Sequence, residues 1–140
     1  KRDGHRLAIL FIDLDNFKPI NDNLGHAIGD HVLRQVAARL RAGVRESDSV
    51  ARIGGDEFVI LLRNVKDDSD VMALAEKLRA TLAQPFEIIP QAIAIAASIG
   101  VALYPDHGTN EIDLLKHADE AMYEAKRGGR NRVTMSGAKT

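Results

Sequence analysis

Apolar positions along the chain fall into runs with two different periods, which predict both strands and helices. Residues 7–12 form the continuous run Leu-Ala-Ile-Leu-Phe-Ile, which is typical of a central strand buried on both faces. Residues 86–89, 92–104 and 131–135 are shorter or longer apolar segments bounded by turn residues, and they predict three more strands.

Four other segments carry apolar residues at helical spacing. Residues 17–24 predict a short helix ended by Gly25. After a loop over residues 25–30, Asp30 is expected to cap a long helix. Its inward residues would be Val32, Leu33, Val36, Ala37, Leu40 and Val44.

The two remaining helices have equally clear starts. The acidic residues 67–70 offer N-caps for a helix over residues 71–82, with Val71, Leu74, Leu78 and Leu82 inward. Thr109 or Asn110 would cap the last helix, which Gly128 and Gly129 close. Its expected inward residues are Ile112, Leu115, Ala118 and Met122.

The chain is organised around residues 52–58, Arg-Ile-Gly-Gly-Asp-Glu-Phe, with β-forming residues on both sides. Two strands joined by Gly-Gly predict a tight hairpin, because such turns need positive φ angles. Asp56 and Glu57 follow at once, so the tip could bring backbone and carboxylates to a metal-bound phosphate. A surface hairpin with acids on its tip is the alternative, and the hairpin alone leaves both open.

Asp13 and Asp15 follow the first strand and project to the same side of an extended chain. Asp15 could instead be the N-cap of the next helix, whereas Asp13 has no such role. If the first strand and the hairpin are neighbours, Asp13 approaches Asp56. Two carboxylates ~5 Å apart repel by roughly 3 kcal/mol at an effective dielectric of 20, and a divalent cation would remove that repulsion.

Composition narrows the class of protein. The chain has 140 residues, 45% hydrophobic and 28% charged, which suits one globular domain with a core. A net charge of −1 gives no broad basic surface for nucleic acid, and the absence of cysteine excludes disulfides and thiolate chemistry. No apolar run approaches the ~20 residues of a membrane helix, so we expect no membrane contact by this segment. The element order predicts an α+β, ferredoxin-like fold with a central antiparallel sheet flanked by helices.

Taken together, these residues resemble the GGDEF family, the diguanylate cyclases, over residues 7–135. The matching motifs are Asp13-Leu14-Asp15-x-Phe17-Lys18-x-x-Asn21-Asp22, Gly25-His26-x-x-Gly29-Asp30, Arg52-x-Gly54-Gly55-Asp56-Glu57-Phe58, Ser98-Ile99-Gly100 and Ala118-Asp119-x-Ala121-Met122-Tyr123-x-Ala125-Lys126. The resemblance implies a palm-type fold like that of adenylyl cyclases. It also implies that residues 1–140 are a single GGDEF domain cut from a longer protein and lacking the family's usual N-terminal helix.

The resemblance implies a reaction and its machinery. Two GTP molecules would condense to cyclic di-GMP with release of pyrophosphate. Asp13, Asp56 and the backbone carbonyl of Leu14 would bind Mg²⁺ or Mn²⁺. Asp56 or Glu57 would serve as the base for the 3′-hydroxyl, and Lys18 would stabilise phosphate charge.

The resemblance also implies the substrate contacts. Asn21 and Asp30 would read guanine, because a carboxylate accepts from both N1–H and N2–H₂. Lys126 and Arg130, placed one helical turn apart, would hold the β- and γ-phosphates. Phe17, His26, Gly54 and Gly55 complete the expected substrate-binding set.

Further expectations concern regulation and partners. Arg45 and Asp48 have the spacing of the family's inhibitory product site, so feedback inhibition by cyclic di-GMP is expected. One site holds one GTP, so catalysis would need a homodimer. Fused sensory or phosphodiesterase domains and a cytoplasmic location are also expected, with a parent protein that could be membrane-anchored. The alternatives are a non-catalytic domain that senses GTP or cyclic di-GMP, and an adenine-using relative, which Asp30 disfavours.

Overall fold

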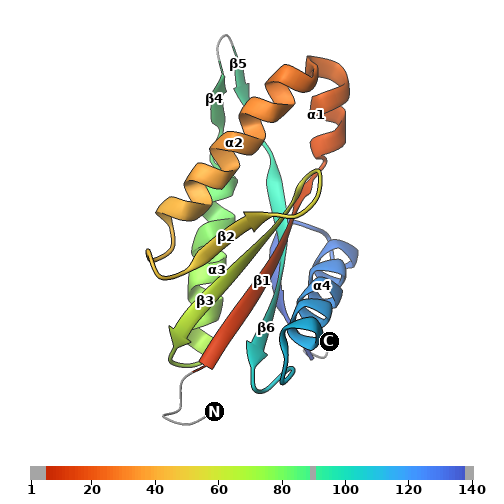
Figure 1. Cartoon of the computed structure of the whole chain (residues 1–140). Helices are drawn as coiled ribbons and strands as arrows, with labels where there is room; N and C mark the ends of the chain where they lie inside the picture. The colour runs from red at the N-terminus through yellow and green to blue at the C-terminus, as the bar shows by residue number, and fades with distance from the viewer. Residues whose placement is uncertain (1–5, 89–90, 138–140) are drawn as a thin grey trace.

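The computed structural model describes residues 6–88 and 91–137, and it contains one main sheet with helices on both faces (Figure 1). The elements, in chain order, are β1 (Arg6–Asp15), α1 (Phe17–Leu24), α2 (His26–Ala42), β2 (Ser49–Arg52), β3 (Glu57–Val65), α3 (Asp68–Leu82), β4 (Phe86–Ile88), β5 (Gln91–Ile93), β6 (Ala96–Tyr104), α4 (Glu111–Arg127) and β7 (Arg132–Met135). Within the described residues, no helix is long and apolar enough to cross a membrane.

The main sheet has the strand order β2-β3-β1-β6-β7, which confirms the α+β class and places β1 at the centre beside β3. β1 runs antiparallel to both β3 and β6. β7 runs parallel to β6, so the sheet is mixed rather than wholly antiparallel. The reason is that α4 connects β6 to β7 as a crossover, which returns the chain in the same direction.

The strand predicted over residues 92–104 is two strands, because β5 pairs with β4 in a separate small ribbon and β6 joins the main sheet. The predicted strand over residues 86–89 is confirmed as β4 over its first three residues, and Ile89 lies outside the described residues. The core of the domain therefore depends on the five-stranded sheet.

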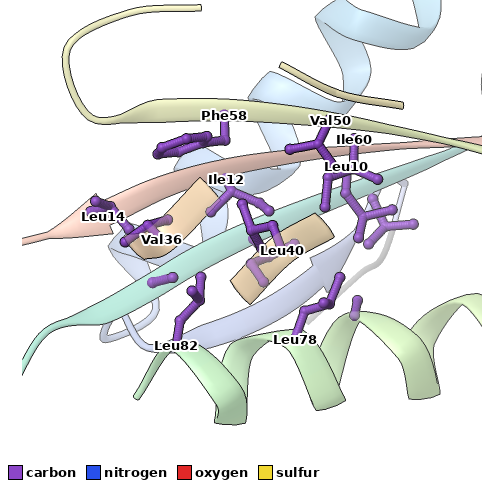
Figure 2. Close-up of a cluster of buried hydrophobic side chains, with 14 of the residues drawn as sticks. Leu10, Ile12, Leu14, Val36, Leu40, Val50, Phe58, Ile60, Leu78 and Leu82 are labelled. Carbon is purple, nitrogen blue, oxygen red and sulfur yellow. The ribbon is translucent and has the colours of Figure 1, made fainter. Parts of the chain in front are cut away.

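Alternation along β1 divides the core between the two faces of the sheet. Leu10, Ile12 and Leu14 face the side covered by α2 and α3, where they pack with Phe58, Val36, Leu78 and other buried residues (Figure 2). Ile9 and Phe11 face α4, where they pack with Leu114, Ala118 and Met122. In Figure 1, α2 and α3 lie to the left of the sheet and α4 to the right. The same alternation directs the next odd-numbered residues, Asp13 and Asp15, towards α4.

The prediction for the start of α2 needs correction. α2 begins at His26, not at Asp30, because Gly25 alone makes the turn from α1 with a φ of 94°. Asp30 therefore lies inside the helix and does not cap it, and residues 26–29 are helical rather than a loop. In α3, the predicted N-cap is confirmed, since the Asp67 side chain accepts a hydrogen bond from the Asp70 amide.

The predicted inward face of α4 is also wrong in part. Asn110 caps the helix as predicted, but Ile112 is 80% exposed and Leu115 is also exposed. The buried residues are Leu114, Ala118, Ala121, Met122 and Ala125. Small residues face the sheet because α4 approaches β6 closely at Gly100, where an added Cβ would clash with the backbone of Ala118 and Met122.

This close approach makes a testable prediction about stability. Gly100→Ala should lower the free energy of unfolding by about 3 kcal/mol, because α4 must move away from β6 to admit the methyl group. Gly55→Ala is the matched control, since an added Cβ there has no neighbour within 4 Å. Urea denaturation of both variants checks this. Equal midpoints for parent and Gly100→Ala would contradict the packing.

Candidate active site

The C-terminal end of β1 presents two acidic side chains to α4. Asp15 is 2% exposed, and its carboxylate accepts hydrogen bonds from Ser98 Oγ at 2.8 Å, Lys126 Nζ at 3.2 Å and the Asn131 amide at 2.9 Å. It is not an N-cap, because Asn16 occupies that position of α1 and makes no capping bond. Asp13 is the more accessible of the two, with 15% of its side chain exposed.

The loop between β2 and β3 brings Asp56 to the end of β1. The Ile53 amide donates to the Glu57 carbonyl, and the Leu14 amide donates to the Asp56 carbonyl at 3.1 Å. Neither Gly54 nor Gly55 has a positive φ, so the prediction of a turn that needs one is wrong. The four-residue loop closes without it, and Gly55 instead leaves open space beside the acids.

Burial and neighbouring acids raise the pKa values of Asp13 and Glu57. Burial raises the pKa of Asp13 to about 6, and the charges of Asp56 and Glu57 add to the effect while Lys126 opposes it. Burial also raises the pKa of Glu57, with Asp56 and Asp119 contributing. Lys126 Nζ lies 3.6 Å from Asp13 and 3.2 Å from Asp15, so a single ammonium serves both carboxylates. The site therefore holds more negative charge than its own cation neutralises.

The carboxylates fit a hard divalent cation that receives its remaining ligands from a bound phosphate and from water. In the described part of the chain, no group of three or more His, Cys, Asp or Glu side chains forms a metal cage. Mg²⁺ usually takes one or two carboxylates and receives its other ligands from phosphates and water. Asp13 and Asp56 supply two carboxylates, and burial together with the charges of Asp56 and Glu57 raises the pKa of Asp13.

A cavity of about 320 Å³ opens beside these acids. It is lined by Phe17, Lys18, Asn21, His26, Asp30, Leu33, Arg52, Gly55 and Asp56, which include seven residues of the expected site. The Asn21 side chain lies 2.9 Å from His26 Nδ1 and packs where a Cβ on Gly29 would clash with it. Gly29 therefore holds α1 and α2 close enough for Asn21 and Asp30 to share one cavity.

The cationic residues are arranged differently from the prediction. α4 ends at Arg127, and Arg130 lies beyond it with a φ of 65°, so Lys126 and Arg130 are not one helical turn apart. Lys126 reaches the acids, whereas Arg130 is exposed. Lys18 is also exposed and pairs with Asp22 at 3.8 Å.

Arg45 and Asp48 lie away from this cavity, in the turn between α2 and β2. The Asp48 carboxylate is 2% exposed and accepts hydrogen bonds from the backbone amides of Arg45 and Arg63, each at 3.0 Å. The Arg45 side chain is 59% exposed and donates to the Arg63 carbonyl. Both residues line a separate cavity of about 450 Å³ between α2, β3 and α3.

Sequence reasoning assigned no role to Arg52 and left the role of Asp15 open, and the fold brings both residues to the site. Arg52 lines the 320 Å³ cavity and donates to the Gly55 carbonyl at 3.3 Å. Its position two residues before Gly54 was the feature of the sequence that could have identified it as a site residue. Asp15 was left between a cap and a site residue, because its three partners come from β6, α4 and the turn before β7.

Comparison with known proteins identifies the family of this chain. The family described as "Diguanylate cyclase, GGDEF domain" matches residues 1–132. The bifunctional diguanylate cyclase/cyclic di-GMP phosphodiesterase MucR of Pseudomonas aeruginosa is 50% identical over 130 residues, which are 93% of this chain and 19% of MucR. Diguanylate cyclase TpbB of the same species is 47% identical over 126 residues, 89% of this chain and 29% of TpbB. The chain thus spans less than a third of either relative.

Solved structures agree with the fold. The crystal structure of the GGDEF domain of TpbB has a TM-score of 0.92 at 43% identity and covers 96% of this chain and 84% of that chain. The GGDEF domain of DgcB from Caulobacter crescentus, solved in complex with c-di-GMP, has a TM-score of 0.88 at 32% identity. It covers 96% of this chain and 80% of that chain.

The raised pKa of Asp13 makes a prediction about stability in the absence of metal. Its pKa of about 6 in the fold lies above its ordinary value of 3.8, so ionisation opposes folding as pH rises through this window. Asp13→Asn removes that ionisation and should be more stable than the parent by roughly 2 kcal/mol at about pH 8, with little difference at about pH 4.

Chemical denaturation in the presence of a chelator, at several pH values, measures this difference. Glu46→Gln, at an exposed carboxylate, is the control and should follow the parent throughout. A parent that is as stable as Asp13→Asn at every pH would contradict the crowding of negative charge at the site.

Proposed function

The chain belongs to the GGDEF family of diguanylate cyclase domains, and we propose that it condenses two GTP molecules into cyclic di-GMP with release of two pyrophosphates. One observation carries the proposal. A single cavity is lined by the groups suited to guanine, Asn21 and Asp30, and by Asp56 of the acidic loop. A nucleotide bound there would have its base and its phosphates in reach of different parts of one site.

Guanine recognition follows from the chemistry of Asp30 and Asn21. A carboxylate accepts two adjacent donors, and guanine presents N1–H and N2–H₂ side by side. Adenine has an acceptor at N1, so it would leave Asp30 facing a lone pair. A site built around hydrogen bonds rejects an analogue that cannot make them. His26, held by Asn21, and the ring of Phe17 complete the base side of the cavity.

The acids and cations divide the work on the phosphates. Asp13, Asp56 and the Leu14 carbonyl would hold Mg²⁺ or Mn²⁺, which when bound supplies charge stabilisation at the phosphates. Lys126, Arg130 and Lys18 would contact phosphate oxygens, and Arg52, which lines the cavity, would add a fourth cation. Gly54 and Gly55 keep side chains away from the approach to the acidic loop.

Proton transfer is assigned to Glu57, with Asp56 as the neighbouring carboxylate. The 3′-oxygen of one GTP attacks the α-phosphorus of the other, its proton passes to the carboxylate, and pyrophosphate leaves. The raised pKa of Glu57 makes it a stronger base than an ordinary carboxylate. Because one domain holds one GTP, two domains must face each other to form both bonds of the ring. A reaction that consumes GTP would take place in the cytoplasm.

Incubation with GTP and Mg²⁺, followed by chromatography, tests this function. We expect cyclic di-GMP and pyrophosphate, with a rate per domain that rises with protein concentration. Asp56→Ala should lower the rate by at least roughly 100-fold, because it removes several kcal/mol of charge stabilisation. Turnover of ATP at the rate of GTP would contradict the assignment of Asp30.

The alternative is a non-catalytic domain that binds GTP or cyclic di-GMP and regulates an attached domain. The observation that favours it is that cyclic di-GMP phosphodiesterase NbdA of Pseudomonas aeruginosa, which is named for hydrolysis alone, is 41% identical to this chain over 128 residues. The presence of Asp13, Asp56 and Glu57 together favours catalysis. Tight GTP binding with no product, even under forced dimerisation, would support the sensor.

We also propose that cyclic di-GMP inhibits the domain at Arg45. The exposed guanidinium can stack on guanine and pair with phosphate. Asp48 contributes by holding the turn, since its carboxylate is already engaged by two backbone amides. The complex of the DgcB domain with c-di-GMP supports the class of ligand.

Arg45→Ala should raise the cyclic di-GMP concentration for half-inhibition by at least about tenfold while the uninhibited rate stays unchanged. Lys116→Ala, at an exposed lysine on α4, is the control for loss of a positive charge. Product inhibition curves of the three proteins measure the effect. A variant at Arg45 that remains as sensitive as the parent removes this idea.

A further inference from the structure

Asp15 and Ser98 are polar residues that are buried as whole residues, at 2% and 0% exposure. Both oxygens of Asp15 are in use. Oδ1 accepts from Ser98 Oγ and Lys126 Nζ, and Oδ2 accepts from the Asn131 amide. The partners come from β6, from the last turn of α4 and from the turn that precedes β7. One carboxylate at the centre of the sheet thus joins three segments that are distant in sequence.

We infer that Asp15 is a positioning residue for phosphate binding: it fixes Lys126 and the turn of residues 128–131 at the end of the sheet, so that their cationic and amide groups face the triphosphate of GTP. This inference rests on the proposed function. It separates the roles of the two acids of β1, since Asp13 faces the ligand and Asp15 faces the protein.

The surroundings of Asp15 argue against three other roles. A metal ligand must reach the cation, but the Asp15 carboxylate is 2% exposed and both of its oxygens accept from donors of this chain. The N-cap position belongs to Asn16. A purely structural salt bridge would not need Lys126 to sit also 3.6 Å from Asp13, between the buried acid and the accessible one.

The position of Lys126 explains why the anchor matters. A lysine has a long flexible side chain that loses much entropy when it is fixed. Asp15 fixes the ammonium before the nucleotide arrives, so that binding does not have to order it. The same carboxylate accepts from the Asn131 amide. The segment between Lys126 and Asn131 contains Arg130, which has a left-handed backbone conformation. Loss of Asp15 should therefore weaken the hold on phosphates and spare the hold on guanine.

Two variants separate these effects while keeping the size of the side chain. In Asp15→Asn, one oxygen becomes an NH₂ group, so either the Asn131 amide or the Ser98 and Lys126 pair faces a donor. In Asp15→Leu, no acceptor remains, so Ser98 Oγ, Lys126 Nζ and the Asn131 amide all lose their bond to residue 15. Glu111→Gln, an equal change of charge at the far end of α4, is the control.

Equilibrium binding of GTP and of GMP, each with Mg²⁺, is the first measurement. GTP affinity should fall at least about tenfold in both Asp15 variants, whereas GMP affinity should stay within about twofold of the parent. Glu111→Gln should bind both like the parent. Equal loss of GTP and GMP affinity, or no loss of either, would overturn the positioning role.

Amide exchange without nucleotide is the second measurement, and it does not depend on the proposed function. The Asn131 amide should exchange about tenfold faster in Asp15→Leu than in the parent, because its acceptor is gone. If the parent binds no GTP, the proposed function fails, and the exchange still decides whether Asp15 holds the turn. Equal exchange of the Asn131 amide in both proteins would overturn the anchor.

Discussion

The site has fewer positive than negative groups, and its arrangement depends on this imbalance. Strand alternation puts Asp13 and Asp15 on the same side of β1, and a single ammonium, that of Lys126, lies between them. Asp15 is fully satisfied, since it also has Ser98 and the Asn131 amide. Lys126 Nζ lies 3.6 Å from Asp13, and burial and the charge of Asp56 keep the pKa of Asp13 raised. We propose that this incomplete neutralisation gives the site an affinity for a cation and for a cation-bound phosphate.

The packing of α4 makes that arrangement possible. Lys126 reaches β1 only because α4 lies close to the sheet, and Gly100 with the alanines of α4 gives it the room. On the other face, Gly29 brings α1 and α2 close enough to put Asn21 and Asp30 in one cavity. Gly100 and Gly29 thus permit the close packing that places α4 on one side of the proposed site and α1 and α2 on the other.

Sequence reasoning predicted most of the fold, because the apolar runs of β1, α2 and α3 have clear periods and the N-caps of α3 and α4 are clear. It failed where two signals competed. Glycine usually favours loops, but Gly29 lies inside α2 and permits close contact with α1. The start of α2 was therefore misplaced at Asp30. In α4, the large apolar residues Ile112 and Leu115 were predicted to face inward because of their size, but small residues face the sheet instead. The role of Asp15 could not be predicted, because its partners are 83, 111 and 116 residues away in sequence.

The central claim is that Asp13 and Asp56 share one divalent cation with a nucleotide bound beside Asp30. A crystal structure with Mn²⁺ and a non-hydrolysable GTP analogue, with Mn²⁺ located by its anomalous scattering, tests this claim most directly. We predict one Mn²⁺ peak in contact with both carboxylates and with a phosphate oxygen, and guanine against Asp30. Mn²⁺ bound elsewhere, or an analogue whose base lies outside the cavity, would contradict the account.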